Sequence, residues 1–178
     1  MKLVIVGAGG LARVIAEMIT RAGVDELVGF VDDSTSAPNQ LLGLPVLGKS
    51  KDLPKIAADG VAGGAVIAIG NPQVRLKLGL AAKEAGLELP AIVAASAVVS
   101  LSAKLSEGVI VAPQAVIGPN VTVGSLSIVN TAAVVEHDAA IDEVCNIGPR
   151  ALVDARAKLG REVSVKGGQV VGPDQELA

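Results

Sequence analysis

Residues 98–175 carry an aliphatic side chain at every sixth position, and this period limits the possible folds more than any other feature of the sequence. When the segment is divided into consecutive hexads without gaps, the second position holds thirteen aliphatic residues in a row: Val99, Leu105, Val111, Ile117, Val123, Val129, Val135, Ile141, Ile147, Val153, Leu159, Val165 and Val171. The sixth position holds Ala, Val, Ser or Cys in all but the last two hexads. A strict repeat of this kind is typical of a solenoid, in which each repeat packs on its neighbours.

The period of six matches neither the period of an α-helix nor the simple alternation of a β-strand. It fits a short, flat strand followed by a corner, with three such units in each coil of 18 residues. The aliphatic second position then points into a triangular prism and stacks on the residue one coil away, and the small sixth position leaves room at the corner. The repeat therefore predicts a left-handed parallel β-helix over residues 91–178.

The composition excludes several classes of protein. Hydrophobic residues make up 51% of the chain but aromatic residues only 1%, so the core must consist of Val, Ile, Leu and Ala. No apolar run approaches the ~20 residues that span a bilayer, and no basic segment precedes an apolar one as in a signal peptide. A single cysteine cannot form an intramolecular disulfide, which favours a cytoplasmic location. The net charge of −3, without basic clusters, argues against nucleic acid as a partner.

The N-terminal residues follow the pattern of a β-α-β unit with a glycine-rich first turn. A strand over residues 2–6 runs into Gly7, Gly9 and Gly10, a helix follows over residues 11–22, and a second strand ends in Asp32 and Asp33. The turn fits the pattern G-x-G-x-x-A, in which backbone amides and the helix N-terminus can receive a phosphate. Asp32 is then placed to accept a hydrogen bond from a ribose hydroxyl.

Three interpretations of this glycine-rich turn remain open. Only about 90 residues precede the repeat, which is enough for one mononucleotide-binding half but not for two. A nucleotide or nucleotide-sugar site is favoured, a complete NAD site is an alternative, and a purely structural turn is the third. The rest of this half predicts a buried strand over residues 65–69, a helix over residues 73–85, and a strand over residues 89–93 that leads into the repeat. The α/β Rossmann-like domain is thus expected over residues 1–90.

Motifs spread over nearly the whole chain resemble one family of enzymes. They are the glycine-rich half, Asp32-Asp33, Ala68-Ile69-Gly70-Asn71 with Arg75, and Asn130-Thr131-Ala132-Ala133-Val134-Val135-Glu136-His137-Asp138. The chain resembles the NeuD/PglD-type hexapeptide-repeat acyltransferases, the sialic-acid O-acetyltransferases and UDP-4-amino-sugar N-acetyltransferases of bacterial surface-glycan biosynthesis.

The resemblance implies an acetyl-CoA-dependent sugar acetyltransferase in which each half has its own task. The N-terminal domain would hold the nucleotide or sugar, the β-helix would form a homotrimer, and acetyl-CoA would lie along the β-helix between neighbouring subunits, without any metal. The implied substrate-binding residues are Gly7, Gly9, Gly10, Asp32, Asp33, Gly70, Asn71 and Arg75. N-acetylation and O-acetylation remain equal alternatives, because one base serves an amine or a hydroxyl.

His137 is the only histidine, and it occupies the fourth place of its hexad, where it is expected to point outward. Attack of an amine or hydroxyl on a thioester needs a base that works near neutral pH, and imidazole supplies one. A neighbouring carboxylate can fix the tautomer, with Asp138 as the first choice and Glu136 as the second. A solvated surface histidine between two acids is the alternative. Cys145 falls on a small corner position and is expected to be part of the core rather than a nucleophile.

The acetyl-CoA residues are predicted from the coil that follows His137. A tetrahedral oxyanion needs a backbone amide, and the resemblance implies that it comes from the coil one turn beyond the histidine. One period of 18 residues from His137 leads to Ala155, within the donor region 154–156. Arg156 is a candidate to contact the CoA phosphates, and Asn146 and Gly148 complete the expected set. The family usually has a further coil after this point, so a non-catalytic trimeric scaffold that binds a nucleotide-sugar is the alternative function.

Overall fold

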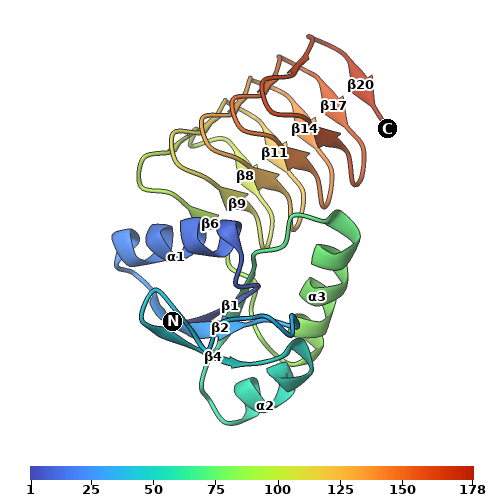
Figure 1. Cartoon of the computed structure of the whole chain (residues 1–178). Helices are drawn as coiled ribbons and strands as arrows, with labels where there is room; N and C mark the ends of the chain where they lie inside the picture. Colours follow the sequence, from blue (N-terminus) through green and yellow to red (C-terminus); the bar gives the residue numbers. More distant parts are fainter. The chain divides into compact units, whose positions relative to one another are not determined.

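The structure is a computed structural model that describes residues 1–178. It contains two compact units, Met1–Pro90 and Ala91–Ala178 (Figure 1). None of its helices has the length and apolar character needed to cross a lipid bilayer.

The first unit is built on a five-stranded sheet with the order β3-β4-β2-β1-β5. Neighbouring strands run parallel except at the edge, where β3 is antiparallel to β4. The strands are β1 (Lys2–Val6), β2 (Glu26–Val31), β3 (Gln40–Leu41), β4 (Leu44–Gly48) and β5 (Gly64–Ile67). The helices are α1 (Gly10–Ala22), the 3-10 helix η1 (Ser50–Asp52), α2 (Leu53–Ala58) and α3 (Pro72–Glu84). The predicted α/β half is confirmed.

The glycine-rich turn connects β1, an inner strand of this sheet, to the first helix. Strand β1 is buried from Leu3 onward, as expected for a strand with neighbours on both sides. Helix α1 buries Ile15, Met18 and Ile19, and it ends at Gly23, whose φ of 65° is the left-handed conformation that glycine adopts readily.

The strand predicted over residues 89–93 does not form as one element. Glu88 makes a single parallel bridge with Gly64, and regular pairing resumes only at β6 (Ile92–Val93). Pro90 lies between these two points and has no N–H with which to continue a ladder. Strand β5 also ends two residues earlier than expected, at Ile67.

The second unit is a parallel β-helix with one two-residue strand in each hexad (Figure 1, green to red). After β6, its strands are β7 (Val98–Val99), β8 (Lys104–Leu105), β9 (Ile110–Val111), β10 (Val116–Ile117), β11 (Thr122–Val123), β12 (Ile128–Val129), β13 (Val134–Val135), β14 (Ala140–Ile141), β15 (Asn146–Ile147), β16 (Leu152–Val153), β17 (Lys158–Leu159), β18 (Ser164–Val165), β19 (Val170–Val171) and β20 (Glu176–Leu177). They form three five-stranded parallel sheets, ordered β19-β16-β13-β10-β7, β20-β17-β14-β11-β8 and β18-β15-β12-β9-β6. The predicted β-helix is confirmed.

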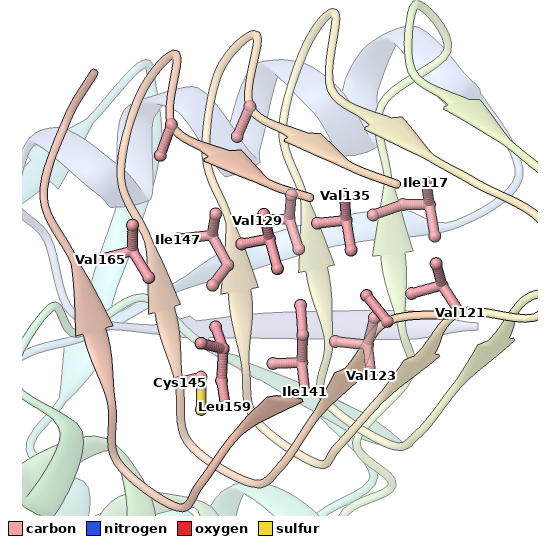
Figure 2. Packing of buried hydrophobic residues seen from close by; sticks show 14 of the residues in the cluster. Ile117, Val121, Val123, Val129, Val135, Ile141, Cys145, Ile147, Leu159 and Val165 are labelled. Atoms are coloured by element: carbon pink, nitrogen blue, oxygen red, sulfur yellow. The ribbon is translucent and has the colours of Figure 1, made fainter. Parts of the chain in front are cut away.

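The second and sixth hexad positions supply the core of the β-helix. Side chains one coil apart lie next to one another in rows, such as Val129, Ile147 and Val165 in Figure 2. Each fully buried aliphatic side chain contributes about 1.5–3 kcal/mol to folding, so the rows stabilise the prism cumulatively. Cys145 is fully buried among them, as expected.

Most corners are β-turns with a left-handed residue at the fifth hexad position. Positive φ angles occur every six residues at Gly108, Gln114, Asn120, Leu126, Ala132, Asp138, Val144, Arg150, Arg156, Glu162, Gly168 and Asp174. The sixth-position amide donates back to the third-position carbonyl, as from Ala133 to Asn130 at 3.0 Å. A left-handed third residue closed by this bond is the geometry of a type II turn, which favours proline one place earlier, as at Pro119 and Pro149. The side chains at positions four and five therefore project from the corner.

Candidate functional site

His137 and Asp138 form a hydrogen-bonded pair on one corner of the β-helix. They follow β13 as the two central residues of a turn, and Asp138 has the left-handed φ of 61° that is common at these corners. His137 Nδ1 and Asp138 Oδ2 lie 2.8 Å apart, and both side chains are about half exposed. The Asp138 amide donates to Pro119 O at 2.9 Å and the Arg156 amide to His137 O at 3.1 Å, so both neighbouring coils hold the turn.

In this pair the two imidazole nitrogens have the donor and acceptor roles that a general base requires. An ionised carboxylate only accepts hydrogen bonds, so Nδ1 donates to Asp138 and the exposed imidazole keeps Nε2 as the acceptor. The His137 hydrogen bond is the main cause that holds the pKa of Asp138 below its ordinary value, and a hydrogen bond from Asn120 is the second. No hydrogen bond joins the Glu136 side chain to His137, so the geometry favours Asp138 over Glu136.

Asn120 belongs to this group, although the sequence motifs did not point to it. Its Nδ2 donates to Asp138 Oδ1 at 3.1 Å, and its own backbone amide donates to Ser102 Oγ at 3.0 Å. Asn120 precedes Asp138 by 18 residues, which is one coil, so the repeat contained the signal that places these two side chains together.

All three amides of the predicted donor region, residues 154–156, already have acceptors. The Asp154 amide donates to Val171 O at 3.0 Å, and the Arg156 amide is the one bound to His137 O. The Ala155 amide donates to the carboxylate of Asp154 at 2.7 Å. Because only the acceptor of Ala155 is a rotatable side chain, Ala155 is the one amide here that a ligand oxygen can gain by displacement.

The other predicted acetyl-CoA residues do not form one cluster within a protomer. Arg156 makes a two-point ion pair with Asp174, with both contacts at 2.7 Å. Asn146 begins β15 in a different sheet, and Gly148 follows it at a different corner from His137. Gly148 also has a structural requirement of its own, since a Cβ there would lie 2.5 Å from the backbone nitrogen of Gly167 in the next coil.

In the first unit, Asp32 and Asp33 line a small hollow of about 130 Å³ beside Gly7. Asp32 accepts hydrogen bonds from the amides of Ala8 at 2.6 Å and Ser34 at 2.8 Å. Asp33 accepts from the amide and hydroxyl of Ser50, and these two bonds hold the pKa of Asp33 below its ordinary value. The turn amide of Ala8, a candidate phosphate donor, is therefore bonded to Asp32.

The three glycines of the turn differ in what the structure requires of them. Gly7 has a φ of 109°, and a Cβ there would lie 2.9 Å from Ala68 O. Gly9 and Gly10 have open space where a Cβ would lie, and they begin α1 without a side-chain cap. Space beside an exposed helix N-terminus is compatible with the predicted phosphate contact.

Arg75 and Asn71 shape the neighbouring loop. The Arg75 side chain is fully buried, and its Nη1 donates to Ile69 O at 2.7 Å and Gly70 O at 2.9 Å. The Asn71 side chain caps α3 by accepting a hydrogen bond from the Val74 amide at 3.0 Å. In this structure the guanidinium holds the loop through the carbonyls of Ile69 and Gly70, and a contact between Arg75 and the substrate stays a prediction.

Comparison with solved structures identifies relatives over the full chain. The chain is 28% identical to the acetyltransferase domain of PglB from Neisseria gonorrhoeae in complex with acetyl coenzyme A, with a TM-score of 0.86 over 98% of this chain and 92% of that one. It is 32% identical to PerB from Caulobacter crescentus in complex with CoA and GDP-perosamine, with a TM-score of 0.84 over 100% of this chain and 92% of that one. The chain belongs to the PglD/PerB family of sugar N-acetyltransferases.

Further comparisons agree with membership of the PglD/PerB family. Residues 2–79 match the PglD N-terminal domain. A histidine-to-alanine mutant of the GDP-perosamine N-acetyl transferase from Caulobacter crescentus, in complex with CoA and GDP-perosamine, is 31% identical, with a TM-score of 0.85 over 99% of this chain and 90% of that one. No curated protein matches the chain by sequence. The resemblance seen in the sequence motifs is thus confirmed.

Proposed function

We propose that this chain transfers an acetyl group from acetyl-CoA to the amino group of a nucleotide-linked sugar, with His137 as the general base. The observation that carries the proposal is the His137–Asp138 pair, which leaves Nε2 as an exposed acceptor at the surface of the β-helix. The relatives support the substrate class, since their structures hold acetyl coenzyme A, or CoA together with GDP-perosamine.

The reaction needs one proton to move twice. The sugar amine attacks the thioester carbonyl, and His137 Nε2 takes a proton from the nitrogen as the C–N bond forms. The tetrahedral intermediate then collapses, the C–S bond breaks, and the CoA sulfur leaves with the proton that the imidazolium returns. Asp138 stays ionised throughout and stabilises the positive charge on the ring.

The negative oxygen of the intermediate requires a hydrogen-bond donor, and the Ala155 amide is our candidate. It lies one coil beyond His137, and its present acceptor is the carboxylate of Asp154. The mechanism therefore requires Asp154 to turn away when acetyl-CoA binds.

The histidine mutant among the relatives fits a base that is not needed for binding. That protein lacks one histidine side chain and still holds both CoA and GDP-perosamine. His137 is the only histidine of the present chain, so it is the only residue here that can supply an imidazole base.

For the nucleotide part of the substrate, we propose the hollow beside Asp32 and Asp33. Its walls present carboxylate oxygens, which accept hydrogen bonds from the hydroxyl groups of a ribose or the N–H groups of a base. Gly9 and Gly10, at the start of α1, remain the candidates for a phosphate contact.

We also propose a homotrimer, supported by an apolar stripe on the outer face of one sheet of the β-helix. The stripe consists of the first hexad positions Val98, Val116, Val134, Leu152 and Val170. The corresponding residues on the β8–β20 sheet are Lys104, Thr122, Ala140, Lys158 and Glu176, so the apolar character is not a general feature of this position. Val98 is 63% and Val170 61% exposed, and an apolar stripe of this kind favours association with another subunit.

The stripe also separates the two groups of predicted acetyl-CoA residues. The corner with Ala155 and Arg156 follows its strands, and the corner with Gly148 precedes them. A second copy seated on the stripe would border both corners, which supports an acetyl-CoA site between subunits as part of the proposal.

The proposed activity is tested by incubating the protein with acetyl-CoA and UDP- or GDP-linked 4-amino sugars. We expect a sugar product heavier by one acetyl group, with the acetyl on nitrogen, detected by mass spectrometry and NMR. The matched control is the same nucleotide sugar with a hydroxyl in place of the amine, which should remain unmodified. Binding of both ligands without any product would instead favour the non-catalytic scaffold.

A further inference from the structure

The corner that carries His137 holds a vertical column of polar residues, one from each coil. The fifth hexad positions of this corner are Ser102, Asn120, Asp138, Arg156 and Asp174, spaced 18 residues apart. Adjacent turns are joined by backbone hydrogen bonds, as from the Asp138 amide to Pro119 O at 2.9 Å and from the Asp174 amide to Ala155 O at 3.0 Å. The spacing of these side chains is therefore fixed by the β-helix itself.

Within the column, Asp138 has a neutral donor on one side and a cation on the other. Asn120 Nδ2 donates to Asp138 Oδ1 at 3.1 Å, and His137 Nδ1 lies 2.8 Å from Oδ2, so each oxygen has one partner. Arg156 stands one coil beyond Asp138, as Asn120 stands one coil before it. Its guanidinium turns away and binds both carboxylate oxygens of Asp174, from Nε and Nη2, at 2.7 Å each.

The groups that bind the two carboxylate oxygens of Asp138 decide whether Asp138 can accept the hydrogen bond from His137 Nδ1. Asp138 is exposed, so its carboxylate can rotate unless both oxygens are held. A guanidinium binds carboxylates in a two-point geometry that is stronger than a hydrogen bond from an amide, which makes Arg156 the main competitor for Asp138. If Arg156 took both oxygens, Nδ1 of His137 would lose its acceptor.

We propose that Asn120 and Asp174 are positioning residues for His137: Asn120 holds the Asp138 carboxylate in place, and Asp174 keeps Arg156 away from it. This inference rests on the proposed role of His137 as the base, but the arrangement of the column can be tested without any assay of acetyl transfer.

The charged groups around the imidazole come from three coils. Glu136 and Asp138 belong to the same turn as His137, Asp154 and Arg156 lie at the corner one coil on, and Asp174 one coil further. In the coil that precedes the one with His137, all residues at this corner are neutral, and Asn120 is one of them.

The kinetic test replaces Asn120 with Ala. We expect kcat to fall about tenfold while the KM values for acetyl-CoA and the sugar stay unchanged, because the proposed role of Asn120 acts only through the base. The matched control is Gln114→Ala. Gln114 also stands at a left-handed fifth position, and its amide also donates to a serine hydroxyl one coil earlier, but at a different corner. An equal loss in both variants would overturn the role of Asn120.

The direct test uses the single imidazole of the chain as a probe. In ¹⁵N NMR of the histidine-labelled protein, we expect the tautomer with hydrogen on Nδ1, because that nitrogen donates to Asp138. Asn120→Ala and Asp174→Asn should each increase the tautomer with hydrogen on Nε2, and adding Arg156→Gln to Asp174→Asn should restore the wild-type spectrum. Restoration separates release of Arg156 from damage to the final coil.

Two outcomes of this NMR experiment would overturn the proposal. One is a wild-type spectrum with hydrogen mainly on Nε2, and the other is a tautomer ratio that neither Asn120→Ala nor Asp174→Asn changes. If the ratio responds as expected but the wild-type protein forms no acetylated sugar, the positioning role stands and the proposed function fails.

Discussion

At the scale of single residues, the structure distinguishes the two acids that flank His137. Asp138 accepts the Nδ1 hydrogen bond, whereas the Glu136 side chain forms no hydrogen bond with the ring. We expect Asp138→Asn to lower kcat/KM by about a hundredfold, because an amide can present its NH₂ to Nδ1 and favour the wrong tautomer. Glu136→Gln should leave the rate nearly unchanged. A larger effect of Glu136→Gln than of Asp138→Asn would contradict this assignment.

Asp33 gives a pH-dependent contribution to stability through its bonds to Ser50. Because these bonds lower the pKa of Asp33 in the folded protein, its stabilising effect is present above the unfolded value of about 3.9. It is lost as pH falls through the lower folded value. Asp33→Asn should therefore cost more unfolding free energy at about pH 7 than at about pH 2.5, as measured by urea denaturation. An equal cost at both pH values would contradict the charge effect.

At the scale of structural elements, the position of a residue in its hexad predicts whether it lies in the core of the β-helix. Ile147 at a second hexad position is 1% exposed, and Lys158 at a first position is exposed. We expect Ile147→Ala to lower the free energy of unfolding by about 2–5 kcal/mol, because it leaves a cavity in the prism. Lys158→Ala should cost less than about 0.5 kcal/mol, since its ion pair with Glu176 is on the surface. Similar urea midpoints for the two variants would contradict the assignment of the core.

The hexad period predicted the strands of the β-helix well because every hexad must place its aliphatic side chain in the interior. A one-residue shift would move an aliphatic row from the interior to the surface, so thirteen consistent hexads leave one register. The site predictions came from the motif around His137 and the coil that follows it, so Asn120, in the coil before, was missed. The spacing of one coil between Asn120 and Asp138 was present in the sequence, but which of two exposed side chains turns toward the other depends on rotamers.

In the first unit, the sequence predicted the turn and the helices but did not show how the Arg75 side chain is bonded. Arg75 follows a loop beside a glycine-rich turn, where a ligand contact and a bond to loop carbonyls look alike in the sequence. Only the fold shows that its guanidinium is buried against Ile69 O and Gly70 O. Pro90 likewise interrupts a strand that the apolar pattern alone extended.

At the scale of the whole molecule, the apolar stripe predicts the oligomeric state. We expect a trimer by sedimentation velocity, and we expect Val98→Glu combined with Val170→Glu to yield monomers, because charges at both ends of the stripe oppose its burial. Lys158→Glu, on the polar sheet, is the control and should remain trimeric. The monomeric variant should also lose affinity for acetyl-CoA if that ligand lies between subunits. A wild-type protein that sediments as a monomer would contradict this proposal.

The central claim is that the half-exposed imidazole of His137 acts as the base for acetyl transfer and does not serve primarily in binding. The most direct test compares His137→Ala with the wild-type protein, using calorimetry for acetyl-CoA binding and thiol release for turnover with a nucleotide-linked amino sugar. We predict nearly unchanged binding and a fall in kcat of about a hundredfold or more. Full turnover by His137→Ala, or a loss of rate explained entirely by lost acetyl-CoA binding, would contradict the account.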